Sequence, residues 1–427
     1  MKEKLTKSNA LLKDSLDIIP LASQTFSKSY LYYPRDHSPL FLKRGNGAMV
    51  WDIDGNQYLD MVSGLMAIVL GYNDSDVNQA IINQLSQGIS FSLATELEYQ
   101  LASLLVNHIP CAEMVRFGKT GTDVTSAAIR VARAYTNRDH ILVCGYHGWQ
   151  DWYIGTTSRS LGVPNAVSHL TQTVPYNDLD ALEALLKTNK YAAFILEPTN
   201  AHPPKTGYLE GVRELTSKYN TVLVFDEIVT GFHFALGGAQ EYFGVTPDLA
   251  CFGKGLGNGM PLSAVVGKRD IMKTMDDIFF SGTFGGEALS LAAGIAVIQK
   301  MTTEPVIQHL WDFGTHVHED ITSIIKECNL EAHVQLLGYA PWKILMFSNH
   351  ATASSEAIKT FFQKEMIANG VLILASHNIS FAMKEKEREM LKNAYVNTLE
   401  KLAYFLSKEN LIDNLNCPII QPVFKIR

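Results

Sequence analysis

The stretch CFGKGLGNGMPLSAVVG, residues 251–267, sets one lysine, Lys254, among closely spaced glycines and then resumes an apolar run. Glycines at this density let the backbone adopt positive φ and approach a ligand closely. A lysine held in a desolvated cleft has a lowered pKa and becomes an amine nucleophile that can form a Schiff base. For an isolated GKG turn the commoner interpretation is a lysine exposed in a loop. The residues at the ends of the other predicted strands are therefore needed to choose between the two interpretations.

Continuous apolar runs alternate with helical patterns through the middle of the chain. TVLVFDEI (221–228) reads as a buried strand that delivers Asp226 at its end, and comparable strands are predicted at the ranges 114–118, 140–144 and 191–199. This alternation predicts an α/β fold with a mostly parallel sheet flanked by helices. Ligands bind at the carboxyl ends of such strands. The polar residues expected there lie at Gly118 to Thr122, Tyr146, Glu197 and Asp226.

Changes in composition and hydrophobic pattern along the sequence divide the chain of 427 residues into four parts. Residues 1–47 form an N-terminal segment, and 48–70 contain a hairpin signalled by Asp54-Gly55 that joins a small domain. Residues 71–304 form the large domain, and residues 305–427 have the amphipathic helices and short strands of a smaller α+β domain.

Composition excludes several classes of protein. The net charge is −7 and no basic cluster occurs, so nucleic acid and anionic membranes are not expected partners. The five cysteines are scattered without a CxxC pair, which favours a reducing compartment. No apolar stretch approaches the length of a membrane helix and no signal peptide is recognised, so a cytoplasmic protein is expected. His316 and His318 diverge on a helix, and no metal site is predicted.

A phosphate site is predicted where Gly121-Thr122-Asp123 opens a helix directly after a strand. The free N–H groups and the positive end of the helix dipole bind phosphate there, and Thr120 and Thr122 can add hydroxyl donors. A plain threonine N-cap is an equally good interpretation of this stretch alone. Two nucleotide motifs fail, because a Walker motif needs glycine at Glu113 and GxGxxG needs glycine at Asn258 or Met260.

The remaining strand-end residues suit a planar cofactor with a basic nitrogen. A carboxylate such as Asp226 keeps a pyridine nitrogen protonated and makes the ring an electron sink, although a lone aspartate is more often a cap or an ion-pair partner. Tyr146 can stack on a ring or simply pack in the core, and His147 lies beside it. Glu197 and Thr283 are weak signals on their own.

Together these residues resemble the class III pyridoxal-phosphate-dependent aminotransferases, and most closely the glutamate-1-semialdehyde 2,1-aminomutase branch. The resemblance is colinear from about residue 38 into the C-terminal domain, and five motifs fall in family order: GKTGTDVTSAAIRVARAY, GYHGW, FDEIVTGF, FGKGLGNGMPLSAVVG and SGTFGGEALSLAAG. It implies a fold type I homodimer that binds pyridoxal 5'-phosphate, with active sites shared between subunits.

The resemblance also implies roles for individual residues. Lys254 matches the lysine that forms the Schiff base and then moves the proton, and Asp226 matches the partner of the pyridine nitrogen. Tyr146 and Ile228 match the two hydrophobic faces of the ring. The remaining matches are Gly121 and Thr122 with the phosphate cup, Thr283 with a threonine reaching the phosphate of the neighbouring subunit, and Glu197 with a carboxylate above Asp226.

Departures from the family pattern fall on the phosphate cup and on the substrate side. The usual cup text is replaced by Lys119-Thr120-Gly121-Thr122-Asp123, which keeps the glycine and a threonine. Lys28 lies where the aminomutase has a carboxylate-binding arginine, and a lysine offers no bidentate fork. The segment 375–380 lacks the glutamate of the aminomutase. The residues first expected to contact the substrate and determine specificity are Lys28, Trp149, His377 and Asn378.

Three functions remain open from the sequence. The first is an aminotransferase acting on a primary amine or amino acid and a carbonyl acceptor through pyridoxamine phosphate. The second is an aminomutase that keeps both half-reactions on one substrate. The third is a catalytically inactive interaction protein that retains the fold.

Overall fold

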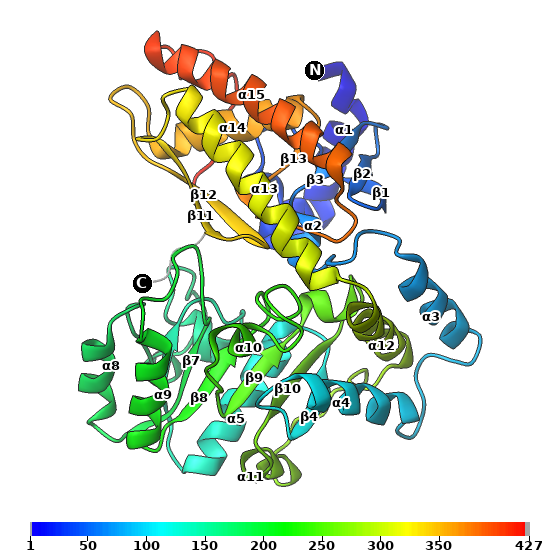
Figure 1. Ribbon diagram of the computed structural model, residues 1–427, viewed down its shortest axis with the longest axis vertical. Coiled ribbons are helices and arrows are strands. Elements are labelled where there is room, and N and C mark those ends of the chain that lie inside the picture. Colours follow the sequence, from blue (N-terminus) through cyan, green and yellow to red (C-terminus); the bar gives the residue numbers. More distant parts are fainter. Residues whose placement is uncertain (1, 423–427) are drawn as a thin grey trace. The chain divides into compact units, whose positions relative to one another are not determined.

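The computed structural model describes residues 2–422 and divides the chain into two compact units (Figure 1). The large unit comprises residues 66–69 and 75–307, and the small unit comprises residues 2–65, 70–74 and 308–422. Residues 2–65 therefore belong to the same unit as residues 308–422.

A seven-stranded sheet forms the centre of the large unit, in the order β4-β10-β9-β8-β7-β5-β6. Neighbouring strands from β9 to β6 are parallel, whereas β10 runs antiparallel to both β4 and β9. Every residue of β7 and β8 is buried, as a continuous apolar run predicts for strands covered on both faces. The predicted α/β fold is confirmed. The strands are β4 (Met114–Gly118), β5 (His140–Cys144), β6 (Thr171–Thr173), β7 (Tyr191–Leu196), β8 (Val222–Asp226), β9 (Leu249–Phe252) and β10 (Ser263–Gly267).

Helix α5 (Gly121–Thr136) carries the apolar face that the sequence predicts. Val124, Ala127, Ala128 and Val131 are buried in one cluster with residues of β5, β7, β8, β9 and β10. Small alanine side chains let the helix lie close to the sheet, which fixes the position of its N-terminus. The other helices of eight or more residues lying wholly in the large unit are α3 (Ser75–Leu85), α4 (Glu96–His108), α8 (Leu179–Leu186), α9 (Tyr208–Lys218) and α12 (Ala288–Thr303).

The small unit contains two small sheets and several long helices. One sheet has the order β1-β2-β3-β13 and the other the order β11-β12-β14. The predicted hairpin at Asp54-Gly55 is confirmed, because β2 and β3 pair antiparallel and Gly55 has a φ of +95°. The strands are β1 (Leu42–Asn46), β2 (Met49–Asp52), β3 (Gln57–Asp60), β11 (Val334–Tyr339), β12 (Trp342–Phe347), β13 (Val371–Leu372) and β14 (Ser376–Asn378).

The predicted C-terminal helices are also found. They are α13 (Val306–Glu327), α14 (Ser355–Ala368) and α15 (Glu385–Ser407), and α1 (Thr6–Ile18) opens the chain. None of the helices among residues 2–422 has the length and hydropathy required to cross a membrane. Within the same residues, no group of three or more His, Cys, Asp or Glu side chains is arranged to hold a metal ion.

Candidate active site

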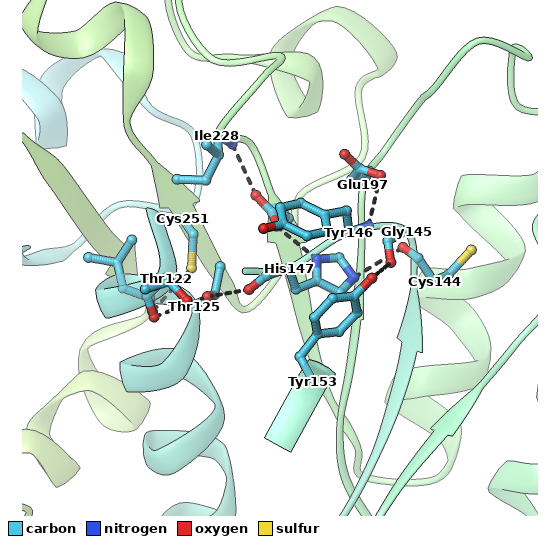
Figure 2. A network of polar contacts seen from close by, with 12 residues as sticks. Thr122, Thr125, Cys144, Gly145, Tyr146, His147, Tyr153, Glu197, Ile228 and Cys251 are labelled. Carbon is cyan, nitrogen blue, oxygen red and sulfur yellow. Dashed lines mark hydrogen bonds and ion pairs between the residues drawn. The ribbon is translucent and has the colours of Figure 1, made fainter. Parts of the chain in front are cut away.

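Two side chains that follow the ends of β8 and β5 meet in the site, and Figure 2 shows one of them, His147, within its network of polar contacts. Asp226 ends β8, and His147 lies in the loop after β5. The Nδ1 atom of His147 is 2.7 Å from Oδ2 of Asp226, and its Nε2 atom is 3.2 Å from the carbonyl oxygen of Cys144. A carboxylate and a carbonyl both accept, so a doubly protonated ring that donates from each nitrogen satisfies the two contacts.

The second oxygen of Asp226 is also bonded. Oδ1 accepts a hydrogen bond of 3.1 Å from the backbone N–H of Ile228. Asp226 and His147 are both buried, so the contact between them is shielded from water. This arrangement holds an anionic carboxylate in one orientation at the end of the strand.

Lys254 follows β9 in a short 3₁₀ turn, Lys254–Gly257. Its φ of +43° lies in the left-handed region, which residues other than glycine adopt only at a cost in backbone strain. Burial lowers the pKa of its amine, and the carboxylates of Glu197 and Asp226 oppose part of that change. Its Nζ atom makes no hydrogen bond or ion pair with residues 2–422, so the amine is available for chemistry.

Glu197 follows β7 and faces the same region. Its Oε2 atom accepts a hydrogen bond of 3.2 Å from the backbone N–H of Tyr146. Burial, and then the nearby Asp226 carboxylate, raise the pKa of Glu197 from 4.5 to about 7. The site therefore holds, beside Asp226, a carboxyl group that changes charge near neutral pH.

The predicted phosphate cup is the N-terminus of α5. Thr120 is the N-cap, and its hydroxyl accepts from the N–H of Asp123 while the Asp123 carboxylate accepts from the N–H of Thr120 at 2.7 Å. The N-cap interpretation of Thr120 is therefore confirmed. The first N–H groups of a helix have no intrahelical partner, which leaves those of Gly121 and Thr122 at the positive end of a 16-residue helix.

Glycine is required at Gly148, beside the cup. Its φ is +108°, and a Cβ atom there would lie 2.1 Å from Oγ1 of Thr122. The same Oγ1 accepts a hydrogen bond of 3.1 Å from the N–H of Trp149. The loop after β5 can approach the cup this closely only because residue 148 has no side chain.

Tyr146 and Ile228, the residues matched to the two faces of the ring, both lie in the large unit. The Tyr146 side chain is 50% exposed, and Ile228 is half-buried beside Gly121, where a Cβ atom would lie 3.2 Å from Ile228 Cδ1. Trp149 is 65% exposed, and Thr283 is exposed on the loop before α12. Contact of these four residues with cofactor or substrate stays a prediction.

The other predicted substrate residues belong to the small unit. Lys28 is exposed on the turn Phe26–Lys28. His377 is fully buried, with Nε2 2.6 Å from the hydroxyl of Tyr395, so it has no exposed atom for a substrate in this packing. Asn378 is buried and donates from Nδ2 to the carbonyl oxygen of Val62 at 2.7 Å.

Sequence reasoning missed the residues that fix the loop after β5. The hydroxyl of Thr125 donates to the carbonyl oxygen of His147 at 2.9 Å, and that of Tyr153 donates to the carbonyl oxygen of Gly145 at 2.8 Å. Thr125 follows Thr122 by three residues on the buried face of α5, which is the only sequence signal for it.

Glu227, the neighbour of Asp226, has a structural role. Its carboxylate accepts from the backbone N–H groups of Ala239 at 2.7 Å and Gln240 at 2.9 Å, at the start of the short helix α10 (Ala239–Phe243). Successive side chains of an extended chain point in opposite directions. Asp226 therefore serves the site, while Glu227 secures a neighbouring turn.

These residues fit pyridoxal 5'-phosphate. The helix N-terminus suits a phosphate dianion, the buried Asp226 suits a protonated pyridine nitrogen, and the unpartnered amine of Lys254 suits an aldehyde. Gly148 lets the loop after β5 lie against Thr122 of the cup, and Gly121 lets Ile228 lie close to the first turn of α5.

Comparison with known proteins also indicates an enzyme that uses pyridoxal 5'-phosphate. A model of the family described as "Aminotransferase class-III" matches residues 32–385. The chain is 35% identical over 389 residues to a 3-aminobutyryl-CoA aminotransferase of Cloacimonas acidaminovorans (strain Evry), covering 88% of this chain and 92% of the relative. It is 33% identical over 397 residues to a glutamate-1-semialdehyde 2,1-aminomutase of Natranaerobius thermophilus, covering 86% and 91%. The crystal structure of an omega-transaminase from Sphaerobacter thermophilus superposes with a TM-score of 0.84 at 27% identity, covering 92% of this chain and 97% of that one.

Proposed function

Because the chain belongs to the class III aminotransferase family and its cofactor is pyridoxal 5'-phosphate, we propose that it transfers an amino group between two substrates. One substrate is a primary amine or amino acid, and the other is a carbonyl acceptor. The observation that carries the proposal is the half-buried, unpartnered amine of Lys254 beside the fixed pair of Asp226 and His147.

When bound, pyridoxal phosphate supplies an aldehyde that takes up the amino group and a protonated ring that accepts the electrons released at the substrate carbon. Asp226 would hold the proton on the ring nitrogen, and His147 fixes the orientation of Asp226. Lys254 would hold the cofactor through its aldehyde and would serve as the base that moves the proton at the substrate carbon. Its lowered pKa supports this role, because a neutral amine is needed to accept a proton.

The remaining predicted contacts orient the cofactor. Gly121 and Thr122 bind its phosphate through the N-terminus of α5, and Tyr146 and Ile228 lie against the two faces of its ring. We further propose that the enzyme is a homodimer in which Thr283 of one copy reaches the phosphate held by the other. The five free cysteines support a reducing, cytoplasmic setting.

Two departures on the substrate side favour an aminotransferase over an aminomutase. Lys28 replaces an arginine, and the segment 375–380 lacks a glutamate of the aminomutase pattern. The test is incubation of the purified holoenzyme with an amino donor and a 2-oxo acid. An aminotransferase forms the corresponding amino acid in stoichiometric amount, whereas an aminomutase forms none and isomerises its single substrate.

A third possibility, a non-catalytic protein with the same fold, gives a different result. Borohydride reduction of the protein with pyridoxal phosphate would then attach no cofactor to Lys254. Peptide mapping that finds the cofactor on Lys254 in wild type, and on no peptide of Lys254→Ala, supports the catalytic proposal.

A further inference from the structure

The loop that carries Thr283 is fixed at its start by two arginines. Arg130 of α5 donates from Nη1 to the carbonyl oxygen of Phe279 at 2.6 Å, and Arg116 of β4 donates from Nη2 to the carbonyl oxygen of Phe280 at 3.0 Å. The partly buried ring of Phe280 packs against the core of the large unit. The start of the loop is therefore held by two backbone hydrogen bonds and one buried ring.

The end of the loop is fixed by a third cation. Nζ of Lys119 lies 2.8 Å from Oε2 of Glu287, and both side chains are largely buried. Glu287 is the N-cap of α12, where its carboxylate accepts from the N–H of Ser290 at 3.0 Å. The same strand and helix that form the phosphate cup thus hold both ends of the loop 279–287.

The residues between these anchors are presented outward. Phe279 is 81% exposed and Phe284 is 60% exposed, although the loop is anchored on both sides. The hydroxyl of the exposed Thr283 has no partner among residues 2–422. A loop held at both ends that exposes aromatic rings and an unused donor has the composition of a contact surface.

The apolar surface continues beyond the loop. The backbone N–H of Ala288 donates to the carbonyl oxygen of Ile89 at 2.9 Å, which places the start of α12 beside the segment 89–93. That segment also exposes Phe91 and Leu93. Each copy of the chain has one such loop and one phosphate cup, so a two-fold exchange between two copies completes both sites with identical contacts.

We propose that Arg116 and Arg130 are positioning residues that hold the loop 279–287 so that Thr283 of one copy completes the phosphate site of a second copy. This inference rests on the proposed function and on the dimer proposed with it. Its distinctive consequence is that the two arginines act on the cofactor of the other subunit, although Arg130 lies on the helix that binds phosphate in its own subunit.

The first experiment measures pyridoxal phosphate binding by apoprotein. The double variant Arg116→Met/Arg130→Met should bind the cofactor about fivefold to tenfold more weakly, as expected for the loss of one well-placed hydrogen bond. Arg269→Met is the matched control, because Arg269 donates to the carbonyl oxygen of Glu113 and should bind as wild type does. Thr283→Ala should weaken binding similarly, and adding it to the double variant should cause no further loss. Additive losses, or unchanged binding by the double variant, would overturn the proposal.

The second experiment separates action within a subunit from action across subunits. Differently tagged Lys254→Ala and Arg116→Met/Arg130→Met chains are co-expressed, and the mixed dimer is purified. The only site with a lysine then belongs to the arginine variant and receives its loop from a chain with both arginines. Borohydride labelling of that lysine should reach half-saturation at the wild-type cofactor concentration. Weak binding at that site, or failure to recover a mixed dimer, would contradict the proposal.

A wild-type control distinguishes failure of this inference from failure of the proposed function, and a second pair of variants guards against misfolding. If wild-type protein takes up no cofactor on Lys254, the proposed function itself fails. If wild type is labelled normally and only the predicted arginine effects are missing, the function stands and this inference alone is wrong. Should the methionine variants not fold, Arg116→Lys/Arg130→Lys replaces them, because lysine keeps the charge and one donor. That variant should lose affinity by a smaller factor in homodimers and recover it fully in the mixed dimer.

Discussion

The imidazole of His147 is bonded to the Asp226 carboxylate at 2.7 Å, across 79 positions of sequence, with both side chains buried. Replacing one member of a buried charge pair leaves the other without compensation, at a cost of about 3 kcal/mol. We expect His147→Leu to lower the stability of the apoprotein by this order and to weaken cofactor binding. Chemical unfolding and cofactor titration measure the two effects. His147→Gln, which keeps one donor, should lose less, and equal losses for both variants would argue against the charge pair.

Lys254 is expected to be indispensable for turnover. Lys254→Ala should abolish amino transfer while keeping the fold and part of the affinity for pyridoxal phosphate, because the phosphate cup and Asp226 are untouched. Lys273→Ala is the control, since Lys273 is exposed and forms an ion pair with Asp276. Single-turnover assays with a panel of amines measure the effect, and normal turnover by Lys254→Ala would refute the central assignment.

Glu197 gives a pH dependence with a defined sign. Its folded pKa of about 7 lies above its ordinary value of 4.5, so the folded state binds more protons than the unfolded state between these two values. Stability from this group is therefore present below about pH 4.5 and is lost as the pH rises through 7. Glu197→Gln removes the loss, so the stability of the variant apoprotein relative to wild type should increase from pH 5 to pH 8 by about 1–3 kcal/mol. Urea unfolding at the two pH values tests this, and a constant difference would contradict it.

His377 has the opposite dependence in the small unit. Burial lowers its pKa from 6.5 to about 3, so the unfolded state binds the proton more readily. Stability from this group is present above about pH 6.5 and is lost as the pH falls toward 3. His377→Gln should reduce the acid sensitivity of unfolding measured between pH 7 and pH 4. His316→Gln, at an exposed position of α13, should leave that sensitivity as in wild type, and the reverse result would exclude the assignment.

Gly148 tests whether the close approach of the loop to the phosphate cup is needed. Gly148→Ala would place a Cβ atom 2.1 Å from Thr122 Oγ1, which must displace the loop and break the Trp149 hydrogen bond. Gly162→Ala is the matched control, because Gly162 has a similarly positive φ of +88° with no atom near its added Cβ. Both variants should lose about 1 kcal/mol of stability from backbone strain. Only Gly148→Ala should also lose cofactor affinity, as measured by titration of the apoprotein, and equal affinities would show that the contact is dispensable.

Much of the architecture could be predicted from local patterns. The continuous apolar runs at β7 and β8, the hairpin at Asp54-Gly55 and the apolar face of α5 are all found where the sequence indicates. Each is encoded within one turn or one strand, where the period of side-chain directions and the turn chemistry act directly. The roles predicted for Lys254 and Asp226 also rest on local features, a glycine turn and a strand end.

Only the tertiary structure decided which of these residues meet. The pairing of His147 with Asp226 follows from the sheet order β8-β7-β5, and so does the burial of Glu197 near Asp226, which raises the pKa of Glu197. The burial of His377 against Tyr395 follows in the same way from packing of β14 against α15. Sequence by itself determined the chemical groups and the elements that carry them. Their partners, burial and charge state depend on contacts between separate elements, which no local periodicity encodes.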